Sequence, residues 1–172
     1  MTAILEKEPV KNITENPGIT KSSILSLLNS TKLETLAFFD VPEEELAMSY
    51  GNGKWSIRQI LHHLTDSELI FQERLKRIIA EPKQVIWAYN QDEWNDAFDY
   101  KNEPLKNKKQ LYKICRELNC ELVEKYYDRF CEKEFVHSIT GVWTLKVEFE
   151  RVATHNQSHI KQIETALAKG KS

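Results

Sequence analysis

The sequence predicts an all-α protein, a four-helix bundle that leaves room for a short hairpin before its last helix. Four stretches of about 20 residues carry apolar side chains at the i, i+3 and i+4 spacing of a helix face. Glycine and proline, which interrupt helices, occur only five times each in 172 residues. Because no strand pattern of comparable strength is present, four long helices around one core are the simplest arrangement.

A single domain is expected to occupy residues 19–172, preceded by an irregular N-terminal arm at residues 1–18 that lies along it. The first helix is predicted from Thr20, its N-cap, to about Phe39. The connection over residues 41–55 contains two glycines close together, and this spacing predicts a tight turn before the second helix.

The second helix has the clearest start in the sequence. Ser56 followed by Gln59 forms a capping box, in which each side chain satisfies a free backbone N–H of the other, and the helix is expected to end at Pro82. The aromatic-rich link at residues 83–105 is long for a small domain, which favours a functional or covering segment over a loose tether. A short helix is expected in this link near Asp92–Phe98.

The third helix is predicted to run from Asn107 to Phe130. Its start repeats the capping-box spacing, because Asn107 is followed by Gln110. Residues 131–143 do not follow a helical pattern, and their alternation of apolar and polar side chains allows a short hairpin before the last helix.

Composition and charge narrow the functional classes. There are 24 basic and 26 acidic side chains, a net charge of −2, so no basic surface for nucleic acid is indicated. No apolar run approaches the roughly 18 residues of a membrane helix, and the charged N-terminus does not resemble a signal peptide. The three cysteines, Cys115, Cys120 and Cys131, lack CxxC spacing and are expected to be reduced thiols in a cytoplasmic protein.

The last helix is predicted from Thr144, its N-cap, to Lys169, with Gly170 as its stop. It carries His155 and His159, which lie on one side of the helix with Cβ atoms about 5–6 Å apart. Both flank the apolar stripe and therefore border the bundle interior. Two imidazoles in this arrangement can bind one metal ion.

The second helix supplies the third candidate ligand. His62 points nearly opposite the apolar stripe of this helix, whereas His63 lies on its flank. If the second and fourth helices are neighbours, His63, His155 and His159 can meet at one point and leave a coordination position open, as in a catalytic metal site. The alternative is that these pairs are accidental surface residues, which is how His137, in the irregular segment, is interpreted.

Motifs of several common enzyme classes are missing, and three other segments match a known family. Position 156 is Asn where zinc proteases of the HExxH type have Glu, and no GxSxG, P-loop or GxGxxG occurs. GKWSIRQILHHLTDSE resembles the helix-two signature of the DinB-like superfamily, and THNQSHIKQI resembles its HxxxH signature. WAYNQDEWNDAF looks like the Tyr-x-x-x-x-Trp segment of its YfiT subgroup. The resemblance extends over residues 18–168.

This resemblance implies a four-helix bundle that binds one divalent metal ion per chain, zinc or nickel, and that often forms homodimers. The implied ligands are His63, His155 and His159. The implied activity is that of a metal-dependent hydrolase or a bacillithiol S-transferase-like enzyme with a small-molecule substrate. Asn156 and Gln157 replace residues that vary in the family, so substrate contacts do not carry over.

The residues themselves leave two reactions and one non-enzymatic alternative open. A metal ion held by neutral imidazoles can lower the pKa of water to about 7 for attack on an electrophile. It can also bind a low-molecular-weight thiol as the thiolate for transfer to an electrophile. The alternative is a dimeric helical bundle that binds a metal or a small ligand without catalysis.

Several further side chains are candidates for the site. Asp66 lies one turn after the second-helix ligand and could orient an imidazole, or it could be a solvated helix residue. Glu68 could line the cavity, or it could pair with a cation on another helix. Three aromatic side chains could either wall a pocket or simply pack: Tyr89, Trp94 and Trp143.

Overall fold

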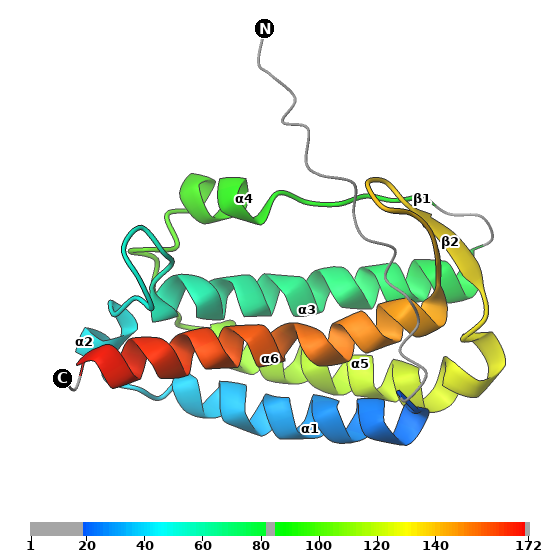
Figure 1. Cartoon of the computed structure of the whole chain (residues 1–172), viewed down its shortest axis with the longest axis horizontal. Helices are drawn as coiled ribbons and strands as arrows, with labels where there is room; N and C mark the ends of the chain where they lie inside the picture. Colours follow the sequence, from blue (N-terminus) through cyan, green and yellow to red (C-terminus); the bar gives the residue numbers. More distant parts are fainter. Residues whose placement is uncertain (1–18, 82–84, 171–172) are drawn as a thin grey trace, which may run out of the picture.

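The computed structural model describes residues 19–81 and 85–170, and its main feature is four long helices lying side by side (Figure 1). α1 and α3 each pack against both α5 and α6. α3 and α6 are therefore neighbours, and the predicted all-α bundle is confirmed. The predicted arm at residues 1–18 lies outside the described residues. The four helices are α1 (Lys21–Phe38), α3 (Ile57–Ala80), α5 (Lys108–Phe130) and α6 (Leu145–Gly170).

Four N-terminal caps are predicted for the long helices, and those of α1, α3 and α6 are present in the structure. At α1, Thr20 caps the helix as predicted. At α3, the Ser56 hydroxyl accepts from the Gln59 N–H, and the Gln59 side chain accepts from the Ser56 N–H at 2.8 Å. The capping box predicted for Asn107 and Gln110 is wrong. An N-cap side chain reaches the first turn from an extended backbone, whereas Asn107 has a ψ of 1°.

The last helix begins as expected and ends against another loop. The Thr144 hydroxyl accepts from the Val147 N–H at 3.4 Å, which supports its role as N-cap. Gly170 is the last residue of α6 and does not have the positive φ of a glycine stop. A Cβ at this position would lie 2.5 Å from the Met48 sulfur, so close packing explains the glycine.

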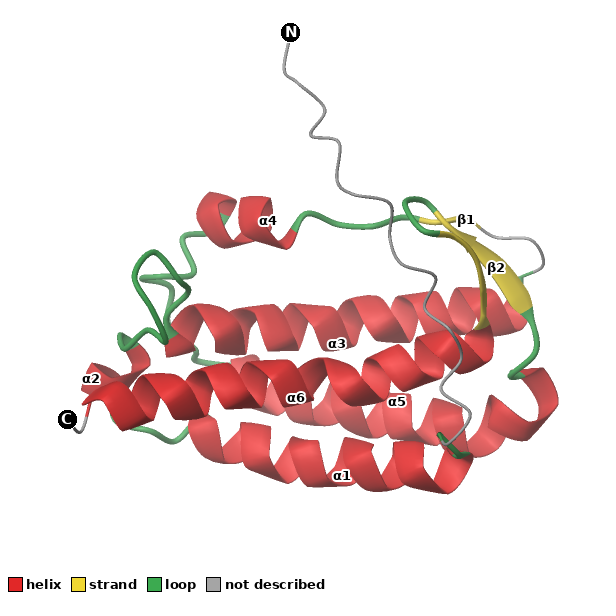
Figure 2. Cartoon of the chain, viewed as in Figure 1, coloured by secondary structure: helices red, strands yellow, loops and turns green. Residues whose placement is uncertain are grey.

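α4 and the three short strands form a thin layer over the α3 side of the bundle, and α2 lies at one end of the bundle (Figure 2). The hairpin allowed by the sequence is present as β2 and β3, and the short helix of the link is present as α4. β1 pairs in parallel with β2. The sequence predicted neither this pairing nor α2. These elements are α2 (Glu43–Leu46), β1 (Val85–Ile86), α4 (Gln91–Ala97), β2 (Glu134–His137) and β3 (Gly141–Thr144).

The bundle core has two apolar clusters and a polar centre. Glu68 of α3 and Arg116 of α5 are fully buried and form an ion pair of 2.7 Å. In sequence they lie between the residues that α3 and α5 give to the two clusters. The cluster toward the hairpin includes Ile24, Leu28, Phe71, Leu75, Phe149 and Val152, and the other includes Leu46, Ile57, Leu61, Leu64, Tyr112 and Ile163.

Candidate metal centre

Three imidazoles from α3 and α6 meet between these two helices. His63 lies in the second turn of α3 and is buried, while His155 and His159 lie one turn apart on α6 and are half-buried. One nitrogen of each ring lies within 4.8 Å of the corresponding nitrogens of the other two. The Nε2 atoms of His63 and His155 are 3.3 Å apart. The predicted convergence of the three rings is therefore present in the structure.

The outward nitrogens of two rings have hydrogen-bond partners. His63 Nδ1 lies 3.2 Å from the Tyr89 hydroxyl, which in turn lies 2.9 Å from the Ser67 hydroxyl. His159 Nδ1 lies 2.9 Å from the side-chain oxygen of Gln162. Because an amide oxygen can only accept, His159 must donate from Nδ1, which leaves the lone pair of its Nε2 free. His155 Nδ1 is buried and has no hydrogen-bond partner within the described residues.

Burial keeps all three rings neutral. Loss of solvent, together with the proximity of His159, lowers the pKa of His63 to about 3. The pKa of His155 falls well below its ordinary value, again chiefly through burial, and burial also lowers the pKa of His159. Neutral imidazole is the form that binds a metal, and three such donors suit zinc or nickel. The residues present therefore fit the divalent ion that their pattern implies.

A small polar pocket opens beside His159. Its volume is about 220 Å³, enough for a small molecule but not for a macromolecule. It lies between the loop before α3 and the start of α4, so both connections contribute to it. Trp55 of this loop also contacts the His63 ring, with ring centres 5.1 Å apart. The other residues that line the pocket are Tyr50, Gly53, Lys54, Gln91, Asp92 and Gln162.

Two side chains of the second helix have surroundings that the sequence did not predict. His62 is fully buried although it points away from the apolar stripe, because the link covers it. Its Nε2–H donates to the Glu103 carbonyl at 2.9 Å, and its ring stacks on Tyr100. Asp66 does not orient a histidine of the centre. It accepts from the Tyr100 hydroxyl and pairs with Lys108 at 3.3 Å, so it anchors the link to the bundle.

The remaining acidic and histidine candidates, Glu68 and His137, lie outside the three-histidine centre. Glu68 forms the buried ion pair with Arg116, which was one of the two readings of the sequence. His137 is buried, and the prediction of a surface position was wrong. Its ring stacks on Trp143 and its Nδ1 lies 2.9 Å from the Thr140 hydroxyl, because the hairpin folds back onto α6.

The aromatic candidates divide between the centre and the hairpin. Tyr89 contacts His63, and Trp94 packs on Tyr89 with ring centres 5.0 Å apart. Trp143 stacks on His137 instead and takes no part in the three-histidine centre. Asn156, the residue that replaces the glutamate of HExxH, is fully buried and donates to the Tyr112 hydroxyl, so it belongs to the core.

Sequence reasoning missed four residues around the centre. Ser67 lies four residues after His63 and Gln162 lies three after His159, so helical spacing alone could have identified them. Trp55 and Arg151 gave weaker signals. Trp55 lies in a loop, and Arg151 precedes His155 by four residues in a helix with many charges.

Other properties of the chain agree with the sequence. Cys115, Cys120 and Cys131 are all free thiols. Within residues 19–81 and 85–170, no helix combines the length and apolar character needed to cross a membrane.

Comparison with known proteins places the chain in a family. The DinB superfamily pattern matches residues 28–163. A protein of Oceanobacillus iheyensis, named "Putative metal-dependent hydrolase", is 29% identical over 99% of this chain and 90% of its own length. A Bacillus cereus protein of the same name is 30% identical over 78% of this chain and 77% of its own.

A solved structure shows the same fold. This structure is that of YfiT from Bacillus subtilis, described as "a probable metal-dependent hydrolase with an unusual four-helix bundle topology". It superposes with a TM-score of 0.80 and 23% identity, over 97% of this chain and 95% of the other. The chain therefore belongs to the DinB superfamily and has a YfiT-like four-helix bundle.

Proposed function

We propose that this protein is a divalent-metal-dependent enzyme in which His63, His155 and His159 bind one metal ion. The observation that carries the proposal is the approach of three neutral imidazoles, one nitrogen of each within 4.8 Å of the others. The names of the relatives, which describe metal-dependent hydrolases, support the same activity.

The surrounding residues orient the rings. The Tyr89 hydroxyl accepts from His63 when that ring is protonated on Nδ1, and Gln162 fixes His159 in the same tautomer. Each ring then directs its Nε2 lone pair toward the shared centre. A zinc or nickel ion bound there would supply a Lewis acid that lowers the pKa of water or of a thiol.

The pocket beside His159 gives a small substrate access to this centre. Its lining is polar, and Lys54 and Asp92 both face it. We therefore propose a small electrophilic substrate with polar groups, which is hydrolysed or transferred to a low-molecular-weight thiol. Both reactions need the same three histidines, so they are separated by whether a thiol is required.

Metal analysis of protein purified without an affinity tag tests the ligand set. We expect about one divalent ion per chain in the wild type, and loss of that ion in His159→Ala. Gln157→Ala is the matched control, because Gln157 is exposed on the same helix and should leave the metal content unchanged. Wild-type protein without any metal would overturn the proposal.

Turnover by the metal-loaded protein tests the activity. Esters, amides and alkylating electrophiles are offered with and without a low-molecular-weight thiol. Turnover without thiol supports hydrolysis, and turnover that requires thiol supports transfer. In either case the rate should fall to background in His159→Ala. A metal-loaded protein that converts none of these compounds would favour the non-enzymatic alternative. Light scattering of the same sample tests the predicted homodimer.

A further inference from the structure

A second polar cluster lies next to the hairpin, one helical turn from the metal centre. We call it the Arg151 cluster and define it as Arg74, His137, Trp143, Glu148 and Arg151. Four of its buried polar atoms have no hydrogen-bond partner within the described residues: Nη1 of Arg151, both carboxylate oxygens of Glu148, and Nε2 of His137. Buried polar atoms are nearly always bonded, so such a concentration points to a binding site.

Two aromatic rings contact the guanidinium of Arg151. Its guanidinium carbon lies 5.5 Å from the ring centre of Trp143 and 5.9 Å from that of Phe71. Its Nη1 is 3.7 Å from Glu148, which is an ion-pair distance but too long for a hydrogen bond. The rings therefore fix the guanidinium, while its Nη1, which has no hydrogen-bond partner within the described residues, stays available to a ligand.

The charges of the cluster favour an anion. Two guanidinium groups, those of Arg74 and Arg151, approach the single carboxylate of Glu148 at 3.8 and 3.7 Å. His137 adds no positive charge at neutral pH, because burial and the two arginines lower its pKa to about 4. The cluster thus has an excess of positive charge, and arginine is the side chain best suited to bind carboxylate or phosphate oxygens.

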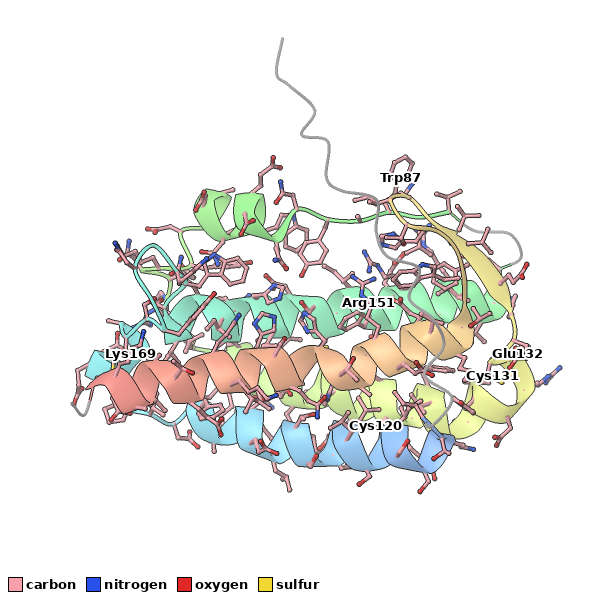
Figure 3. All side chains as sticks on the ribbon, in the orientation of Figure 1. Trp87, Cys120, Cys131, Glu132, Arg151 and Lys169 are labelled. Atoms are coloured by element: carbon pink, nitrogen blue, oxygen red, sulfur yellow. The ribbon has the colours of Figure 1, made fainter. Side chains whose placement is uncertain are left out.

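Arg151 lies on the same face of α6 as the proposed metal ligands. It precedes His155 by four residues, which places the two side chains about one turn, roughly 5–6 Å, apart. The Phe71 ring contacts both, with its centre 5.4 Å from that of His155. Figure 3 shows Arg151 in the region between the long helices and the hairpin.

We infer that Arg151 binds an anionic group of the substrate, a carboxylate or a similar oxyanion, while the reactive group of the same molecule lies at the three-histidine centre. This inference rests on the proposed function and narrows its substrate class. The substrate would be a small molecule in which the anionic group and the reacting atom can reach side chains that lie one helical turn apart.

Two probe thiols of matched length test the inference on the full-length protein loaded with Co²⁺. 3-Mercaptopropionate ends in a carboxylate and 3-mercaptopropan-1-ol in a hydroxyl, and thiolate binding to cobalt is followed by absorption. We expect the carboxylate probe to bind at least about tenfold more tightly, the effect of one charge-assisted hydrogen bond.

Substitutions assign this preference to one side chain. Arg151→Met keeps an apolar chain between Phe71 and Trp143. This variant should bind the two probe thiols with about equal affinity, while its affinity for cobalt stays unchanged. Arg151→Lys should retain part of it, since the charge remains. Lys161→Met is the control, because it removes an exposed charge from the same helix. An equal preference in the wild type and Arg151→Met would overturn the inference.

A metal-free arm separates the two proposals. If cobalt does not bind, the proposed function fails, and propionate is then titrated into metal-free protein while tryptophan fluorescence is recorded. Trp143 adjoins Arg151, so an anion there should alter the signal, and Trp143→Phe identifies the reporter. A change that disappears in Arg151→Met supports the anion site, and an identical response in both proteins overturns it.

Discussion

Two groups of buried polar side chains occupy the same bundle, and they differ in how their hydrogen bonds are satisfied. Every nitrogen of the Arg116 guanidinium has a partner: Nε donates to the Leu28 carbonyl, Nη1 to Glu68 and the Val152 carbonyl, and Nη2 to Thr31. The three-histidine centre instead brings imidazole nitrogens toward one another, and nitrogen is a poor partner for nitrogen when both carry lone pairs.

This difference separates stability from function. A buried ion pair with complete hydrogen bonding links helices, and removing one member leaves the charge of the other buried without a partner. A cluster of neutral imidazoles contributes little to folding and is suited to bind a cation from outside the chain.

Arg116→Met should cost about 3–5 kcal/mol of the free energy of unfolding, because it leaves Glu68 buried without its cation. Chemical denaturation measures this loss. The double variant Glu68→Leu with Arg116→Met should recover part of it, since no buried charge remains. A loss below about 1 kcal/mol in the single variant would mean that the pair does not join the helices as described.

Stability should depend on pH through the buried His137. Its folded-state pKa is lowered to about 4, so below the ordinary value of 6.5 the unfolded chain takes up a proton that the folded protein does not. The metal-free wild type should therefore lose stability relative to His137→Gln as pH falls from 6.5 to 4.5. The difference reaches at most about 2.7 kcal/mol. If the free energies of unfolding of the wild type and His137→Gln change equally over this pH range, His137 is protonated in the folded state.

Tyr89→Phe should weaken metal binding about 10- to 100-fold, because His63 loses the partner of its Nδ1. Competition with a chelator measures the dissociation constant. Tyr126→Phe, at a ring that packs on Phe130 of α5, is the matched control and should leave the dissociation constant unchanged. Equal affinity in all three proteins would exclude a role of the Tyr89 hydroxyl in orienting the ring.

His155→Leu should change the stability of the metal-free protein by less than about 1 kcal/mol, or raise it. The imidazole is half-buried, and its buried Nδ1 has no hydrogen-bond partner within the described residues, so an apolar side chain fits the site at little cost. Thermal unfolding after treatment with a chelator measures the effect. A loss as large as that of Arg116→Met would show that the histidines stabilise the fold themselves.

The sequence predicted those features that depend on short stretches of chain. The start of α3 follows from Ser56 and Gln59, which lie three residues apart, and the meeting of His155 with His159 follows from one turn of helix. The approach of His63 needed one further condition, the packing of α3 against α6, which the apolar faces of the two helices supply.

Features that depend on distant segments were missed or wrong. His62 was expected to point away from the core, but Tyr100 and Glu103 of the link cover it from about 40 residues along the chain. Asp66 likewise accepts a hydrogen bond from the Tyr100 hydroxyl and does not orient an imidazole of the centre. His137 became buried because the hairpin folds onto α6, and no local spacing encodes that contact.

X-ray absorption spectroscopy at the metal edge tests the central claim most directly, on protein purified without a tag and without added thiols. Three imidazole nitrogens at about 2.0–2.1 Å from a zinc ion are expected, together with an oxygen donor such as water in the fourth position. Zinc added in excess to His63→Ala should show one imidazole fewer than in the wild type. Sulfur ligands at about 2.3 Å, or a metal ion without histidine ligands, would contradict the claim.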